Sequence, residues 1–182
     1  IDELGKRVFE EMDYINEAKN AEKFRSMHQK NIKIAVPKIY NHLTSRRVLT
    51  MEWIEGTKLT NLDDVKKLGI DPDEMIDIGV QCSLEQLLEH GFFHADPHPG
   101  NLLALEDGRL CYLDFGMMSE VSRESRSGLI QAVVHLVNKN FDKLSHDFVK
   151  LGFLSSEVNL EPIVPAFQDV FVNAIELGVS KM

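Results

Sequence analysis

Three side chains with oxygen donors, Asp96, Asn101 and Asp114, stand at separations that suit phosphate chemistry. Between Asn101 and Asp114 lie two short apolar runs, 102–105 and 110–113, on either side of an Asp-Gly turn signal. A tight hairpin there would bring Asn101 and Asp114 to neighbouring strand ends. Two oxygen ligands at that place suit Mg²⁺, which keeps waters and substrate phosphates around it. Asp96 would orient an attacking hydroxyl or accept its proton.

The same residues match two signatures of protein kinases. In kinases the catalytic-loop Asp and a metal-binding Asn stand at the separation of Asp96 and Asn101. A second metal-binding Asp then opens a D-F-G triplet, here Asp114-Phe115-Gly116. One signature alone would be weak, but both occur here in the right order. They predict ATP and Mg²⁺ as cofactors.

Other residues are similar to one particular group of kinases. The run Pro97-His98-Pro99-Gly100 departs from the common H-R-D pattern and resembles the UbiB/ADCK family of atypical kinases. Glu11-Met12-Asp13 and the segment 48–56, Val-Leu-Thr-Met-Glu-Trp-Ile-Glu-Gly, resemble that family too. The resemblance covers most of residues 1–155. It implies a protein-kinase-like fold, binding of ATP with Mg²⁺, and a link to ubiquinone, plastoquinone or other prenyl-lipid metabolism.

The resemblance also implies roles for individual residues. Glu17 resembles the helix-C Glu that pairs with the ATP-binding lysine, and Glu11 and Asp13 resemble a regulatory acidic pair. Asp96 resembles the catalytic-loop Asp. The two metal ligands would be Asn101 and Asp114, with Asp114 the main one, and the hinge whose backbone holds adenine would be Glu52, Trp53 and Ile54.

The expected fold class is therefore α+β and protein-kinase-like, with a partial N-lobe and a mostly helical C-lobe. The resemblance places the partial N-lobe at residues 1–56, with helix C and two strands leading to the hinge. It places the C-lobe at 57–182, with the catalytic loop and the DFG hairpin, truncated at its C-terminus. No Gly-x-Gly occurs anywhere, and Lys38 follows the helix that carries Glu17, where no ATP-binding lysine belongs. We therefore expect the chain to be a piece of a longer protein.

Composition limits the partners. The net charge of −9 argues against nucleic acid as an electrostatic partner. No apolar run approaches the roughly 20 residues that span a membrane. Cys82 and Cys111 lie in apolar runs and are expected to be buried free thiols. The resemblance favours a plastid or mitochondrial protein, or a membrane-associated one in bacteria, with prenyl-lipid or membrane association supplied by the parent protein.

Local patterns predict the elements that position the site. A helix is expected over 3–28, with Ile15 and Phe24 among its apolar positions, and strands over 36–42 and 47–53, followed by a connection at 54–60. A helix starting near Asp71 should run to Gly91, with one apolar face made of Ile76, Val80, Leu84, Leu87 and Leu88. Residues after Gly116 look helical. The segments expected to form helices there are 129–137, which should be buried, 140–151 and 162–181.

Two alternatives stay open at this point. One is a pseudokinase binding module that keeps the fold without the transfer. The other is a metal-dependent hydrolase, because His94, Asp96 and His98 form an H-x-D-x-H pattern whose imidazole and carboxylate groups suit a transition metal. The hydrolase needs a further ligand and leaves Asn101 and Asp114 unexplained. His94 is better explained as a brace for the loop backbone.

Overall fold

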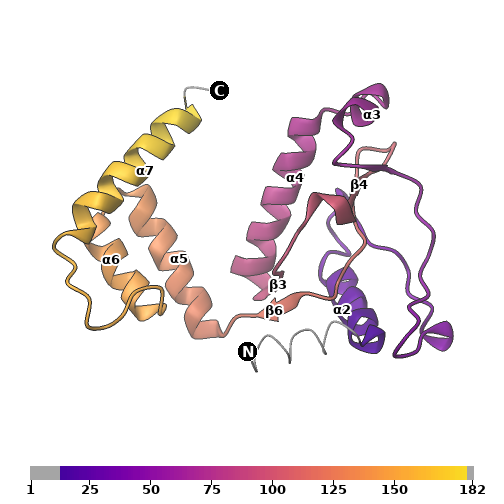
Figure 1. Cartoon of the computed structure of the whole chain (residues 1–182), viewed down its shortest axis with the longest axis horizontal. Helices are drawn as coiled ribbons and strands as arrows, with labels where there is room; N and C mark the ends of the chain where they lie inside the picture. The colour runs from indigo at the N-terminus through magenta and orange to yellow at the C-terminus, as the bar shows by residue number, and fades with distance from the viewer. Residues whose placement is uncertain (1–12, 180–182) are drawn as a thin grey trace. The chain divides into compact units, whose positions relative to one another are not determined.

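A computed structural model describes residues 13–179, without the side chains of 172–179. The chain divides into two compact units, the first ending at Glu120 and the second beginning at Val121. Within the described residues, all strands belong to the first unit and the second is helical (Figure 1). The expected lobe boundary at residue 56 is a different division, and it stays a prediction.

Helix α2 (Tyr14–Met27) is the described part of the helix expected over 3–28. The carboxylate of Asp13 caps its start and accepts a hydrogen bond from Ile15 N at 3.1 Å. Of its apolar positions, Phe24 is buried, whereas Ile15 is 38% exposed. The small residues Ala18 and Ala21 fill the buried face instead, because they let the helix lie close to the sheet.

The main sheet has the strand order β1-β5-β4-β2. The predicted hairpin is confirmed: β4 (Leu102–Ala104) and β5 (Leu110–Tyr112) are antiparallel. Gly108 has a φ of +80° in their turn, a conformation that favours glycine. Strand β1 (Ile34–Ala35) runs parallel to β5. Strand β2 (Thr57–Lys58), which lies inside the expected lobe connection, is antiparallel to β4.

The strands predicted over 36–42 and 47–53 are not continuous. The two segments are joined by isolated antiparallel bridges, Ile39 to Met51 and Ser45 to Val48. The 3₁₀ helix η1 (Asn41–Leu43) interrupts the first segment. Pro37, which is fully buried, has no N–H for a ladder bond. These two features explain why alternating residues do not form regular strands here.

Helix α3 (Leu62–Lys67) precedes the long helix α4 (Pro72–Glu85), which starts after the N-cap Asp71 as expected. A π-helical segment η2 (Gln86–His90) extends α4, and Gly91 ends it at a φ of +67°. The predicted apolar face was wrong. Three side chains of the predicted face are exposed, Ile76, Val80 and Leu84, and the other two, Leu87 and Leu88, are partly buried. The buried side chains of α4 lie on a different face: Met75, Ile78 and Cys82.

A second, two-stranded sheet pairs β3 (Phe92–His94) with β6 (Met118–Glu120), which are antiparallel. Strand β6 was not predicted, since only helices were expected after Gly116. Between β3 and β4 the chain makes a 3₁₀ turn, η3 (Pro99–Asn101). The β3–β6 pairing therefore encloses the catalytic-loop and D-F-G segments between its two strands. It holds both ends of the candidate site.

The second unit consists of α5 (Arg123–Val137), α6 (Phe141–Lys150) and α7 (Ile163–Val179). The three expected helices are confirmed, and Ala132, Phe141 and Leu144 form their buried core. The expectation that 129–137 is buried was wrong, because Val134 and Val137 are at least half exposed. In the described part of the chain, every helix falls short of the length and apolar character needed to cross a bilayer.

Candidate functional site at the DFG hairpin

Asn101 and Asp114 lie side by side at the open end of the β4–β5 hairpin. Asn101 Nδ2 donates a hydrogen bond to Asp114 Oδ2 at 2.8 Å. Gly116 N donates to the other carboxylate oxygen, Oδ1, at 2.9 Å. Leu113 N donates to the carbonyl of Asn101 at 3.1 Å, which ties the two strand ends together. The proximity predicted from the spacing and the turn signal is confirmed.

His94 joins the catalytic loop to the D-F-G segment. Its Nδ1 accepts a hydrogen bond from Asp96 N at 3.2 Å, so its Nε2–H donates to the carbonyl of Asp114, 3.0 Å away. Burial lowers the pKa of His94, which keeps the ring in the neutral form that this pattern requires. Gln86 Oε1 accepts from His94 N at 2.9 Å and fixes the start of the loop. The bracing role expected for His94 is confirmed.

The loop between Asp96 and Asn101 is organised by its own side chains. Gly100 N donates to Nδ1 of His98 at 3.0 Å, and Asn101 N donates to the carbonyl of His98 at 2.9 Å. A Cβ added to Gly100 would lie 2.9 Å from His98 Nδ1, so the ring covers the glycine closely. Asp96 itself is exposed.

Glu17 reaches the D-F-G segment from helix α2. Phe115 N donates to Glu17 Oε1 at 3.3 Å, and Glu17 as a whole is only 9% exposed. Burial raises the pKa of Glu17; the Phe115 N–H opposes this shift and the nearby charge of Asp114 adds to it. No cation pairs with Glu17 among the residues that the structure describes. This carboxylate is therefore a strong attractor for a positive group.

Asn20 is a site residue that the sequence reasoning missed. It lies three positions after Glu17 on the same face of α2, and its Nδ2 donates to the carbonyl of Phe115 at 2.9 Å. Both backbone groups of Phe115 are thus held by one helix. The Phe115 ring is buried, with its centroid 5.3 Å from that of Phe24. The polar i, i+3 pair was the signal that could have identified Asn20.

The cavities divide the predicted residues into two groups. One cavity of about 410 Å³ is lined by Tyr14, Glu17, Asp114, Gly116 and Met117, so it joins α2 to the D-F-G segment.

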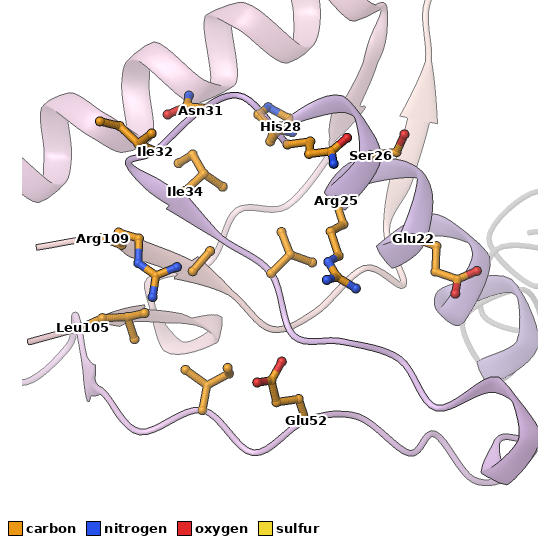
Figure 2. A pocket seen from close by; sticks show the side chains of 14 residues that line it. Glu22, Arg25, Ser26, His28, Asn31, Ile32, Ile34, Glu52, Leu105 and Arg109 are labelled. Carbon is orange, nitrogen blue, oxygen red and sulfur yellow. The ribbon is translucent and has the colours of Figure 1, made fainter. Parts of the chain in front are cut away.

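A second cavity of about 700 Å³ lies between α2 and the segment 34–54 and includes Glu52 and Ile54 (Figure 2). Trp53 is 87% exposed and lines a third cavity of about 510 Å³ with Ile54. None of these three cavities is lined both by the predicted hinge residues and by Asp114.

The segment predicted to be the hinge is held by contacts with Lys38 and at Gly56. Glu52 N donates to the carbonyl of Lys38 at 2.8 Å, and Lys38 N donates to Glu52 Oε2 at 3.0 Å. At Gly56 a Cβ would lie 2.8 Å from Leu105 Cδ2 and 3.0 Å from the carbonyl of Ala104. Only a residue without a side chain lets the hinge segment pass so close to β4.

The regulatory pair predicted by resemblance is described only in part. Glu11 lies outside the described residues. Asp13 caps α2, and its Oδ2 is 3.3 Å from Arg46 Nε, so its charge already has a local partner.

The histidine pattern behind the hydrolase alternative does not form a metal site. Both ring nitrogens of His94 bond to backbone, and His98 Nδ1 is used by Gly100. Among the described residues, the three-residue group of His, Cys, Asp or Glu side chains close enough to share an ion is a different one: His28, Glu85 and His90.

Similarity to known proteins agrees with this geometry. Over its whole length the chain is 59% identical to the Synechocystis protein sll0005 and spans 27% of that protein. It is 48% identical to the chloroplastic Arabidopsis thaliana protein ACTIVITY OF BC1 COMPLEX KINASE 3 and spans 26% of it. It thus spans about a quarter of the length of these relatives. The structure of Mycobacterium tuberculosis Rv3197 in complex with erythromycin has the same fold, with a TM-score of 0.68 and 24% identity over 87% of this chain and 40% of that one.

The expected α+β, protein-kinase-like fold class is confirmed by this likeness. A family model, described as the ABC1 atypical kinase-like domain, matches residues 1–148. The chain therefore belongs to the ABC1 atypical kinase-like family, as its resemblance to the UbiB/ADCK kinases implied.

Proposed function

We propose that this chain carries the metal-binding and catalytic loops of an ATP- and Mg²⁺-dependent atypical kinase or ATPase. The observation that supports the proposal best is the convergence of three segments on Asp114. Asn101 bonds its carboxylate, His94 bonds its carbonyl, and Glu17 holds the next residue from helix α2. Such convergence of polar groups around a carboxylate is expected of a metal and phosphate site.

Each residue has a definite task in the proposed reaction. Asp114 and Asn101 would hold Mg²⁺, which when bound offsets the charge of the nucleotide phosphates. Asp96, exposed at the start of the loop, would orient a hydroxyl or water and accept its proton. The backbone of 52–54 would hold adenine. Glu17 would pair with the ATP-binding lysine of the whole protein, because its buried carboxylate favours a cation.

The acceptor and the location are proposed from the family and its relatives. We propose a plastid or cyanobacterial protein, because several relatives are chloroplastic or come from Synechocystis. The proposed acceptor belongs to quinone or other prenyl-lipid metabolism, a link that rests on the family resemblance alone.

The test is Mg²⁺-dependent ATP turnover by the full-length protein with Asp114→Asn. The matched control is Asp107→Asn, which changes an exposed carboxylate in the same hairpin. We expect Asp114→Asn to lower turnover by about 100-fold or more, since a metal ligand supplies several kcal/mol of charge stabilisation. Asp107→Asn should leave turnover unchanged. Equal turnover in Asp114→Asn and the parent would refute the proposal, and ATP binding without turnover in the parent would favour the pseudokinase.

A further inference from the structure

A second cluster of ligand-type side chains lies away from the proposed ATP site. It consists of His28 at the end of α2, Glu85 at the end of α4 and His90 at the end of η2. One ligand atom from each lies within 4.8 Å of the other two. His28 is buried, and His90 and Glu85 are half-buried. Three donors from separate turns thus converge beneath the surface.

His28 is held in the orientation of a metal ligand. Its Nδ1 lies 3.0 Å from the carbonyl of Phe24, so Nδ1 carries the proton and donates it. Metal-binding histidines usually donate their second ring N–H to such a group, which fixes the tautomer and leaves Nε2 as the ligand. The proton on Nδ1 therefore leaves the Nε2 lone pair of His28 available to a metal.

Glu85 and His90 leave one donor atom each for the same centre. Asn31 Nδ2 donates to Glu85 Oε2 at 3.2 Å, which holds the carboxylate and leaves Oε1 facing His90. Oε1 lies 3.7 Å from His90 Nε2, too far for a hydrogen bond. His90 Nε2 is buried and has no hydrogen-bond partner among the described residues. A buried ring nitrogen without a partner is costly and calls for an explanation.

We propose that His28, Glu85 and His90 bind a divalent transition metal such as Zn²⁺. Two imidazoles and one carboxylate are an established ligand set for such ions. Metal bonds of about 2.0–2.2 Å to each donor would place the donor atoms about 3.4 Å apart. The distance between Glu85 Oε1 and His90 Nε2, 3.7 Å, is close to that value. The 700 Å³ cavity borders the cluster at His28 and Asn31 (Figure 2).

The thiol of Cys82 is not part of the proposed ligand set. Its Sγ lies 3.5 Å from His28 Nε2 and accepts a hydrogen bond from Gln86 Nε2, so it neighbours the site without joining the group of three. Burial raises the pKa of this thiol, which favours the protonated form. In the metal-free protein the thiol would donate to His28 Nε2.

The site would act as a clamp between two parts of the kinase-like unit. His28 ends the helix that carries Glu17, and His90 lies immediately before β3 and the catalytic loop. A metal bound by both would fix the end of α2 against the end of η2. This inference does not rest on the proposed phosphoryl transfer.

The test is Zn²⁺ binding by the full-length protein, measured by competition with a chromogenic chelator after removal of metals. We expect His90→Gln and Glu85→Gln to bind one Zn²⁺ fewer, or to bind it about 100-fold more weakly. The matched controls, His146→Gln and Glu74→Gln, change exposed residues and should bind as the parent does. Cys82→Ser should also retain affinity, because Cys82 is not one of the three ligands.

A thermal measurement separates binding from folding. Zn²⁺ should raise the Tm of the parent but not that of His90→Gln. If the ligand variants fail to fold, Asn31→Ala keeps all three ligands and should weaken Zn²⁺ binding by about 10-fold, through loss of the support to Glu85. The proposal is wrong if the parent takes up no Zn²⁺, if the ligand variants bind like the controls, or if Cys82→Ser abolishes binding.

Discussion

At the scale of single residues, Glu17 combines a structural cost with a proposed role. Burial raises its pKa above the ordinary 4.5, so the folded chain holds the proton more tightly than the unfolded chain does. Ionisation therefore lowers the stability of the fold. This loss is absent below pH 4.5 and develops as the pH rises through the raised pKa. A residue retained at such a cost is a candidate for function.

We predict that Glu17→Gln melts at a higher temperature than the parent at pH 7, when residues 1–182 are expressed by themselves without nucleotide. The amide keeps an acceptor for Phe115 N but carries no buried charge. The difference in Tm should vanish as the pH falls below 4.5. Glu22→Gln is the control, since Glu22 is exposed on the same helix and should show no such pH dependence. A Tm difference that is constant across pH would contradict this account.

Gly100 shows how one missing side chain can shape the catalytic loop. Because a Cβ there would lie 2.9 Å from His98 Nδ1, Gly100→Ala should displace the ring and shift Asn101. We expect turnover to fall by about 10- to 100-fold, as misplacement of catalytic groups typically costs, with little change in Tm.

A double-mutant cycle tests whether the His98 ring is the cause. In a His98→Ala background there is no ring for the new Cβ to meet, so Gly100→Ala should cost little further turnover. If the two substitutions instead multiplied their separate effects, the steric explanation would fail.

At the scale of elements, two glycines should respond to alanine in opposite directions. Gly56→Ala would put a Cβ within 3.0 Å of the Ala104 carbonyl, so we expect a loss of about 1–3 kcal/mol in the free energy of unfolding. Gly79 lies inside α4, where a Cβ would meet Leu110 at 3.5 Å, an ordinary contact. Gly79→Ala should therefore stabilise the fold by about 0.5–1 kcal/mol through helix propensity.

Urea denaturation measures the free energy of unfolding of both variants. Their ATP affinities should also differ. Gly56→Ala should also weaken ATP binding in the full-length protein, because Gly56 lies two residues after the proposed adenine-binding segment 52–54. Gly79→Ala should leave it unchanged. If both variants bound ATP with the same affinity, the proposal that residues 52–54 form the hinge would be wrong.

The elements that the sequence predicted well are those whose signals are local. The Asp-Gly turn and its flanking apolar runs determined the β4–β5 hairpin, and with it the meeting of Asn101 and Asp114. The buried face of helix α4 was harder to predict, because Met75, Ile78 and Cys82 also recur at a helical spacing, as the exposed apolar residues do. Spacing shows that a helix has an apolar face, but the partner decides which of two faces is buried.

Contacts between distant segments escaped the sequence reasoning. Asn20 meets Phe115 across 95 positions, and His28 meets Cys82 across 54. No spacing rule links such residues, since only the packing of α2 against the sheet and α4 brings them together. The β3–β6 pairing was also missed. Strand β6 has only three residues, too few for an alternating pattern to show.

At the scale of the whole molecule, the chain has two units with separate cores. The second unit has its own buried residues, and His135 Nδ1 lies 2.5 Å from the buried carboxylate of Asp147 within it. The candidate site and the proposed metal cluster both belong to the first unit. Damage to the second core should therefore stay local.

Leu144→Ala tests this separation. Leu144 is 1% exposed in the core of the second unit, and its truncation should cost about 2–5 kcal/mol through lost burial and a cavity. Hydrogen exchange followed by mass spectrometry of the full-length protein should then show faster exchange in α5 and α6. The amides of α2, β4 and β5 should exchange as in the parent, and ATP affinity should be preserved. Faster exchange in β4 and β5 as well would mean that the two units unfold as one and that the kinase-like site depends on the helical unit for its stability.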